Sequence, residues 1–151
     1  MKINPALTLT SLFIIAPFSV SAANDCQQLQ TKQVESLFEK WETSIRSGIA
    51  EEVVKNYTKD AILIPTLSNK VRDSNESRES YFTEFLKKNP SAKINYRKIE
   101  TGCNFATDSG TYTFTLNNKE VVKARYTFTY KRIGDEWLIS SHHSSMMPED
   151  T

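Results

Sequence analysis

Two kinds of binding motif are missing from this sequence. The 151 residues contain neither a CxxC nor an HxxxH spacing, the arrangements that zinc sites commonly use. No stripe of lysine or arginine suited to nucleic-acid phosphates appears either, since Lys87-Lys88 and Lys131-Arg132 are isolated pairs. We therefore expect no metal, no other cofactor and no nucleic-acid partner.

A hydrophobic run long enough to span a membrane is also missing. Ala6–Val20 is mostly apolar, but it is shorter than the roughly 20 residues that a span needs, and Pro17 interrupts it. Lys2 precedes this run and the small residues Val20–Ala23 follow it, which is the three-part pattern of a secretory signal. The alternative is a membrane anchor. We predict a signal peptide over residues 1–23, a periplasmic or secreted location, and no membrane contact after cleavage.

The mature chain has no net charge. Of 19 basic residues only Lys2 lies in the leader, which leaves 18 basic against 18 acidic residues. The overall charge of the mature chain therefore gives no reason to expect a highly charged binding partner. The remaining residues, 24–151, have the length of one domain and contain no repeat or low-complexity segment.

The two cysteines, Cys26 and Cys103, are the only ones in the chain. An even number in an exported protein favours a disulfide, which would join the N-terminal helix to a strand in the second half. The alternative is two buried free thiols.

Helical periodicity dominates the first half of the mature chain. A long amphipathic helix is predicted from Leu29, Val34, Leu37, Phe38, Trp41 and Ile45, ending at Ser47-Gly48. A short helix, Ala50–Asn56, follows, and then a buried strand, Asp60–Pro65. A third helix, Glu76–Lys88, ends before Pro90.

Alternation with a period of two dominates the second half. Strands are predicted at Ile94–Ile99, from Cys103 to Thr107, at Gly110–Leu116, at Val121–Tyr130 and at Glu136–Ser144, with turns at Asn117-Asn118 and Gly134-Asp135. Helices first and antiparallel strands afterwards define an α+β domain. We expect a cone-shaped fold, with the helices packed on one face of a curved sheet and a pocket between them.

Several stretches resemble a known superfamily. WETSIRSGIAEEVVKNYTKDAILIPTLSNKVRDS, from Trp41 to Ser74, resembles the opening of nuclear transport factor 2-like proteins. Asp108–Leu116, Ala124–Tyr130 and His142–Pro148 resemble secreted bacterial relatives of the calcium/calmodulin-dependent protein kinase II association domain, which are similar to SnoaL-like proteins. The resemblance implies the cone-shaped fold, homodimers through the sheet and higher rings. It does not imply kinase activity, because the Gly-rich loop, HRD and DFG motifs are absent.

Arg125 is the candidate anion ligand. The kinase domain's pocket carries several arginines, one of them just after a histidine in the last strand, but Ser144 stands at the matching place here. Arg125 shares a strand face with Thr127 and Thr129. If that face points into the cone, the guanidinium would bind a carboxylate or phosphate. The alternative is a surface arginine paired with Glu120.

His142 and His143 are adjacent in a strand, so their side chains must point to opposite faces of the sheet. Read without gaps against the kinase domain, Leu138, Ser140, His142 and Ser144 would face the cavity. Either histidine has the chemistry of a general base or a ligand donor. A structural role, through a hydrogen bond to backbone, is the alternative for each.

Other acid–base and aromatic residues complete the candidates. Asp60, Asp108, Tyr57 and Tyr112 have the residue types that enzymes of this superfamily use, although Asp60 also suits the start of a strand and Asp108-Ser109-Gly110 a turn. Trp41, Tyr81, Phe82 and Phe85 would form the helical wall, as core or as pocket lining.

Three functions are consistent with these features. The first is an exported oligomeric domain whose cone binds a small molecule, with an anion favoured because of Arg125. The second is an enzyme of the SnoaL or isomerase type that uses one histidine with Asp108 or Tyr112. The third is a purely structural oligomer built through the exposed sheet face.

Overall fold

The computed structural model describes residues 26–66, 68–117 and 119–148. The predicted signal peptide, residues 1–23, lies outside the described residues. In chain order the elements are α1 (Thr31–Ser47), α2 (Ala50–Val54), β1 (Tyr57–Ile64), α3 (Asn75–Leu86), β2 (Ser91–Gly102), β3 (Phe105–Thr115), β4 (Val121–Ile133) and β5 (Glu136–Met146). None of the helices in these ranges is long and apolar enough to cross a membrane.

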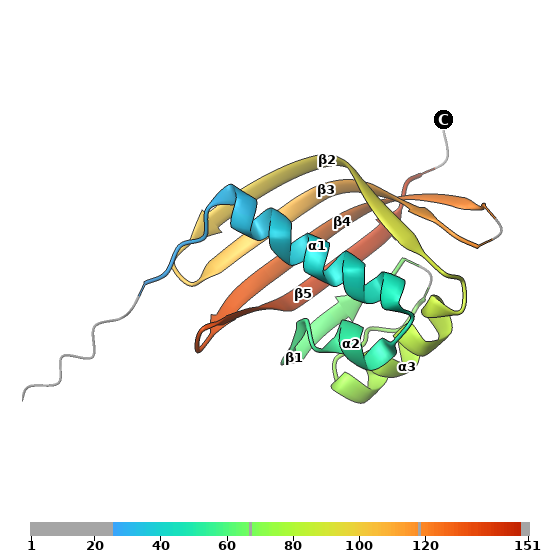
Figure 1. Ribbon diagram of the computed structural model, residues 1–151, viewed down its shortest axis with the longest axis horizontal. Helices are drawn as coiled ribbons and strands as arrows, with labels where there is room; N and C mark the ends of the chain where they lie inside the picture. The colour runs from blue at the N-terminus through green and yellow to red at the C-terminus, as the bar shows by residue number, and fades with distance from the viewer. Residues whose placement is uncertain (1–25, 67, 118, 149–151) are drawn as a thin grey trace, which may run out of the picture.

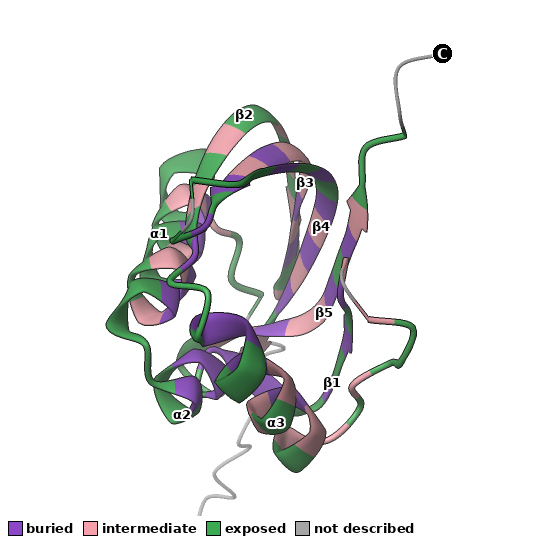
Figure 2. Ribbon diagram, turned by 90° about the vertical axis from the view of Figure 1, so that its right-hand side faces the viewer, coloured by how far each residue is buried: buried purple, intermediate pink, exposed green. Residues whose placement is uncertain are grey.

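The strands form one curved sheet in the order β1-β5-β4-β3-β2. The pairs β2–β3, β3–β4 and β4–β5 are antiparallel, whereas β1 runs parallel to β5. All three helices lie on the concave face of the sheet (Figure 1). Buried residues alternate along the central strands (Figure 2). In β4 the buried rings of Tyr126 and Phe128 pack against Phe38 of α1. The predicted α+β fold, with helices on one face of a curved sheet, is confirmed.

The predicted turn at Asp108-Ser109-Gly110 is wrong, because these residues lie in the middle of the continuous strand β3. Gly110 is needed there for close backbone approach rather than for a turn. A Cβ atom at Gly110 would lie 1.9 Å from the carbonyl oxygen of Tyr96, beside an irregularity in the β2–β3 register. The chain turns instead at Cys103-Asn104, where Asn104 has a φ of 61°.

The predicted pairing of Cys26 with Cys103 is present as a disulfide, with 5.0 Å between the Cα atoms. It joins the segment before α1 to the β2–β3 turn. Backbone contacts support the same junction, since Asn104 donates from its main-chain nitrogen to the carbonyl of Gln27 over 2.7 Å. The N-terminal segment is therefore fixed to one end of the sheet.

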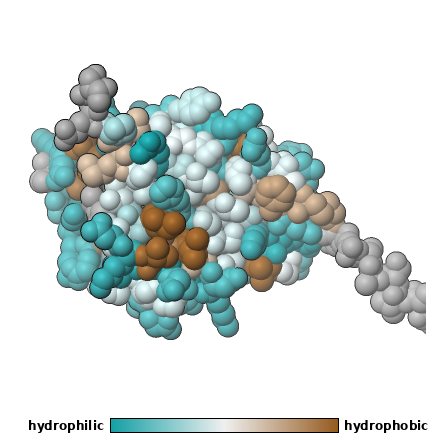
Figure 3. All heavy atoms as spheres, turned by 180° about the vertical axis from the view of Figure 1, so that it is seen from behind, coloured by the Kyte–Doolittle hydropathy of each residue, from teal (hydrophilic) through white to brown (hydrophobic). Residues whose placement is uncertain are grey.

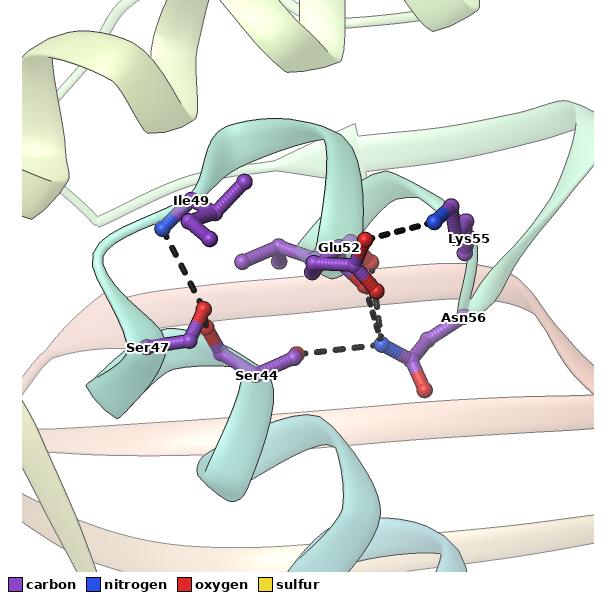
Figure 4. A network of polar contacts seen from close by, with 7 residues as sticks. Ser44, Ser47, Ile49, Glu52, Lys55 and Asn56 are labelled. Atoms are coloured by element: carbon purple, nitrogen blue, oxygen red, sulfur yellow. Dashed lines mark hydrogen bonds and ion pairs between the residues drawn. The ribbon is translucent and has the colours of Figure 1, made fainter.

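A polar network joins α1 to α2 and directs the chain into β1 (Figure 4). The side-chain amide of Asn56 donates to the hydroxyl of Ser44 over 3.0 Å and to the carbonyl of Glu52 over 3.1 Å. The carbonyl of Asn56 accepts a hydrogen bond from the main-chain nitrogen of Ile139 in β5. Because β1 begins at the next residue, this network positions Tyr57 against β5. The strand therefore starts earlier than the predicted Asp60, which lies exposed within it.

Candidate functional site

A narrow cavity lies between the helices and the concave face of the sheet. Its walls are mainly apolar and come from α1, α3, the end of β1 and the strands β3, β4 and β5; the lining comprises Trp41, Leu63, Pro65, Thr66, Tyr81, Phe82, Phe85, Tyr112, Phe114, Leu116, Val122, His142 and Ser144. The free volume is about 20 Å³, which is room for about one water molecule. A few polar groups among these side chains therefore determine what the cavity can bind.

A hydrogen-bonded chain of three side chains includes two of the lining residues, Trp41 and His142. The indole nitrogen of Trp41 donates to the hydroxyl oxygen of Tyr57 over 3.0 Å, and this hydroxyl lies 2.9 Å from Nδ1 of His142. The imidazole also stacks on Phe128, with 4.0 Å between ring centroids, and meets the edge of Trp41. All of these side chains are buried, so the imidazole is held rigidly.

This chain fixes the tautomer of His142. Since Trp41 already donates to the Tyr57 oxygen, the hydroxyl hydrogen of Tyr57 points to Nδ1, the acceptor available to it among the described residues. The proton of neutral His142 therefore resides on Nε2. Burial, followed by the neighbouring His143, lowers the pKa of His142 from 6.5 to about 3, so the ring is uncharged at neutral pH.

The Nε2 atom of His142 is buried and has no hydrogen-bond partner in the described part of the chain. An N–H donor in this situation loses its hydration without replacement, which costs about 1–3 kcal/mol. His142, a residue of the cavity lining, thus carries an unsatisfied donor.

Besides His142, the cavity lining contains three hydrogen-bonded hydroxyl groups, those of Tyr112, Ser144 and Thr66. Tyr112 donates to the hydroxyl oxygen of Ser144 over 2.6 Å, and Ser144 also contacts the hydroxyl of Thr66. Burial raises the pKa of Tyr112, so its phenol stays protonated. These three groups satisfy one another and carry no charge.

The structure separates the predicted ligand-binding residues into two sets. Trp41, Tyr81, Tyr112 and His142 line the cavity. Arg125, Thr127 and His143 lie on the opposite, convex face, where Arg125 and His143 are exposed.

The prediction that Arg125 points into the cone is therefore wrong. Tyr126 and Phe128 lie on the other face of β4 from Arg125, and this face is turned to the helices because their aromatic rings pack against Phe38 of α1. Apolar burial thus selects the other face of the strand for the core. The Arg125 guanidinium instead donates to the carbonyl of Met146 over 3.3 Å at the surface.

In β5, His142 and Ser144 are buried on the concave side as predicted, but Leu138 and Ser140 are not. Thr129 pairs with Ser141 and Tyr130 with Ile139, so Ser140 is an extra residue without a partner in β4. This bulge shifts the alternation and places Ile139 in the core. A gapless reading of strand parity could not anticipate it.

Asp108 lies away from the cavity lining, in a buried ion pair. Its side chain is fully buried and contacts Arg97 over 3.0 Å, while Tyr126 donates to the same carboxylate over 2.8 Å. Burial raises the pKa of Asp108, against the opposing effects of Tyr126 and Arg97. The arrangement is that of a structural pair that joins β2, β3 and β4 beneath α1.

Arg78 is the buried charged residue that the sequence reasoning missed. It is fully buried in α3 and donates to the main-chain carbonyls of Thr58, Lys59 and Ala61, all in β1. Its position four residues before Phe82, on the buried side of the helix, was the available signal. The contacts hold β1 where its register against β5 is irregular.

No group of three or more His, Cys, Asp or Glu side chains among the described residues could hold a metal ion.

Comparison with solved structures establishes the class of fold. A nuclear transport factor 2-like protein of unknown function from Pseudomonas putida superposes with a TM-score of 0.69 at 14% identity, covering 79% of this chain and 87% of its own. A ketosteroid isomerase-like protein from Erwinia carotovora gives a TM-score of 0.61 at 13% identity, covering 76% and 94%. The chain has the nuclear transport factor 2-like fold.

Sequence comparison then gives the family. Residues 30–148 match the calcium/calmodulin dependent protein kinase II association domain family. A crystal structure of a candidate association domain of this kind, from Xanthomonas campestris, is 42% identical, with a TM-score of 0.77 over 81% of this chain and 91% of its own. The chain therefore belongs to the calcium/calmodulin-dependent protein kinase II association domain family. No curated protein sequence matches it.

Proposed function

We propose that this domain binds a small, largely apolar molecule in the cavity, through a hydrogen-bond acceptor placed opposite Nε2 of His142. The single observation that carries the proposal is the buried, unpartnered Nε2–H of His142, a residue that lines the mainly apolar cavity. An acceptor oxygen would satisfy this donor, and the aromatic side chains around it would bury the rest of the molecule. Because the free volume is small, a ligand larger than water requires movement of half-buried rim side chains such as Tyr81.

The same geometry favours binding over proton-transfer chemistry. The described lining of the cavity contains no carboxylate. Nδ1 of His142 is occupied by Tyr57, and the lowered pKa makes the imidazole a weak base. Asp108, the predicted partner of an enzymatic histidine, is engaged by Arg97 elsewhere.

The test uses methyl ketones of increasing chain length, compared with alkenes of the same shape that lack the oxygen. The wild type should bind each ketone about fivefold to tenfold more tightly than the matching alkene. In His142→Phe the two compounds should bind equally. His143→Phe is the matched control, because the adjacent ring is exposed on the other face. If all ketones fail to bind, or the preference persists in His142→Phe, the proposal is wrong. A structure of the wild-type complex gives the same answer without a variant: the ketone oxygen should lie about 3 Å from Nε2.

Self-association through the convex face is a second proposed function. Serine and threonine side chains, among them Ser109, Thr127 and Ser141, occupy the middle of this face. Ile62 and Ile64 at its β1 edge remain 39% and 37% exposed. Figure 3 shows a compact hydrophobic group on the side of the molecule turned away from α1. Light scattering should report a dimer or larger ring that Thr127→Arg dissociates and Thr83→Arg, on the exposed side of α3, leaves intact. A monomeric wild-type protein would contradict this proposal.

Export of the protein is also proposed, and the Cys26–Cys103 disulfide supports it because disulfides persist in oxidising compartments. N-terminal sequencing of the mature protein should begin near Asn24 and no earlier than Ala23. An intact Met1 in the purified protein would contradict it.

A further inference from the structure

A shallow surface groove adjoins the cavity. It has a volume of about 250 Å³ and is lined by Ser68, Arg72, Ser80, Tyr81, Glu84, Phe85 and Lys88. Tyr81 and Phe85 belong to both linings, so one pair of aromatic side chains separates the apolar cavity from the polar groove. A molecule that leaves the cavity past these rings would enter the groove.

Arg72 is fixed in this groove by its backbone. Its main-chain nitrogen and oxygen pair with Leu63, over 2.8 Å and 2.9 Å, so the residue is attached to the end of β1. Its guanidinium lies 5.8 Å from the centre of the Tyr81 ring. Since Leu63 and Tyr81 both line the cavity, the cation is held at the mouth of the cavity.

The guanidinium of Arg72 has unused donors. It donates to the hydroxyl of Ser68 over 3.2 Å, while its Nε is buried without a partner in the described residues. No carboxylate lies within ion-pair distance of it in the described ranges. Glu84, the acid in the groove, is paired with Lys87 over 2.6 Å. A second cation, Lys88, lines the same groove. The groove therefore offers two cations and the hydroxyl of Ser80 to an incoming group.

We infer that the groove binds an oxyanion, carboxylate or phosphate, carried by the same molecule whose apolar part occupies the cavity. This inference rests on the proposed function, and it names the ligand class as an amphipathic anion with an acceptor at its inner end. Arg72 supplies the charged donors, which match carboxylate and phosphate oxygens. The preference for an anion thus comes from the rim of the cavity rather than from Arg125.

The location of the charge has a physical reason. A guanidinium inside the apolar cavity would lose its hydration and need a buried partner. At the half-buried rim, Arg72 keeps part of its hydration, yet it remains close enough to the cavity to bind the outer end of a short ligand. The neutral polar groups inside can then select the inner end by hydrogen bonding alone.

The experiment compares methyl-ketone carboxylates of increasing chain length with the matching neutral amides and with methyl-ketone alkyl phosphates. Affinities are measured by calorimetry for the wild type, Arg72→Gln and the control Lys70→Gln, an exposed cation outside both linings. For the best chain length, the anion should bind at least about tenfold more tightly than the amide. Arg72→Gln should abolish this ratio, Lys70→Gln should preserve it, and added salt should reduce it.

The outcomes separate the two proposals. If amides and anions bind equally in the wild type, or if Arg72→Gln keeps the ratio, the oxyanion site is wrong while cavity binding stands. If neither class binds, cavity binding is wrong and the oxyanion site falls with it. Tighter binding of the phosphate assigns a phosphate monoester, and tighter binding of the carboxylate assigns a carboxylic acid. Unfolding curves of Arg72→Gln and of Arg72→Lys, which keeps the charge, exclude loss of the fold as the cause.

Discussion

The hydroxyl of Tyr57 lies 2.9 Å from Nδ1 of His142, although the two residues are 85 positions apart in the chain. This contact joins the first strand to the last, and it places the imidazole proton on the nitrogen that has no protein partner among the described residues. A single phenol thus determines which hydrogen-bonding group the cavity offers to a ligand.

We expect His142 to remain neutral, with its proton on Nε2, down to about pH 4, because burial lowers its pKa to about 3. Long-range ¹H–¹⁵N spectra report the tautomer and charge of each histidine directly. Only two histidines are present, so His143→Gln assigns both signals. A His142 signal that becomes doubly protonated near pH 6 would contradict the burial argument.

The same lowered pKa predicts acid destabilisation. His142 binds a proton near pH 6.5 in the unfolded chain and near pH 3 in the folded one, so its contribution is complete above pH 6.5 and is lost as the pH falls towards 3. The expected slope is about 1.4 kcal/mol per pH unit in that window. Denaturant unfolding should show this slope in the wild type and in His143→Gln, but a shallower one in His142→Gln. Equal slopes in all three proteins would rule out His142 as the source.

Tyr57→Phe should destabilise the fold by about 2–4 kcal/mol, because it leaves the Trp41 N–H and Nδ1 of His142 without partners. Tyr130→Phe is the matched control. The Tyr130 side chain is equally buried, but its hydroxyl has no partner within the described ranges, so its removal should cost almost nothing. Similar losses in the two variants would mean that the Tyr57 hydrogen bonds contribute little.

Asp108→Asn should destabilise the fold by about 3–5 kcal/mol, because it leaves Arg97 without its buried carboxylate. The double variant Arg97→Met/Asp108→Asn should recover part of this loss, since it removes the unpaired charge as well. A double-mutant cycle from urea unfolding measures the coupling. Additive losses would show that the two side chains do not act as a pair. Ketone binding in the cavity should be unchanged, because Asp108 lies outside its lining.

Arg78→Met should destabilise the fold by about 2–4 kcal/mol, because three carbonyls of β1 lose their donor. Arg46→Met is a suitable control on the surface of α1, where the guanidinium is 63% exposed and pairs with Glu42. Hydrogen exchange should locate the Arg78 effect in β1. If β1 is protected from exchange as strongly as in the wild type, the Arg78 hydrogen bonds are not needed to hold this strand.

Sequence periodicity predicted the order of helices and strands well, because burial of one face forces a period near 3.6 in α1 and of two in β4. It failed at β3, where Asp108-Ser109-Gly110 is typical of a turn. There Gly110 instead allows the backbone of β3 to lie close to the carbonyl of Tyr96. It also failed at the Ser140 bulge, where the ladder to β4 skips a residue. Both failures depend on a neighbouring strand that local sequence does not specify.

The candidate site was predictable only in part. His142, Tyr112, Trp41 and Tyr81 were named from residue type and position, and they do line one cavity. Arg125 was assigned to the wrong face of the sheet. A period of two divides the residues of a strand between two faces, but it does not say which face is buried. Arg72 was missed, since it lies in a polar, turn-rich segment whose chain path brings it back to Leu63.

The sequence by itself determined the fold class, the family and the separation of His142 from His143 onto opposite faces, since these follow from periodicity, local motifs and strand geometry. Only the tertiary structure decided which face is buried, which tautomer His142 adopts and where a cation meets the cavity. These outcomes depend on contacts between distant segments, such as Tyr57 with His142 and Arg72 with Leu63. Such contacts form when the sheet curves around the helices, and the energy of burying aromatic rings outweighs the preference of any single polar residue.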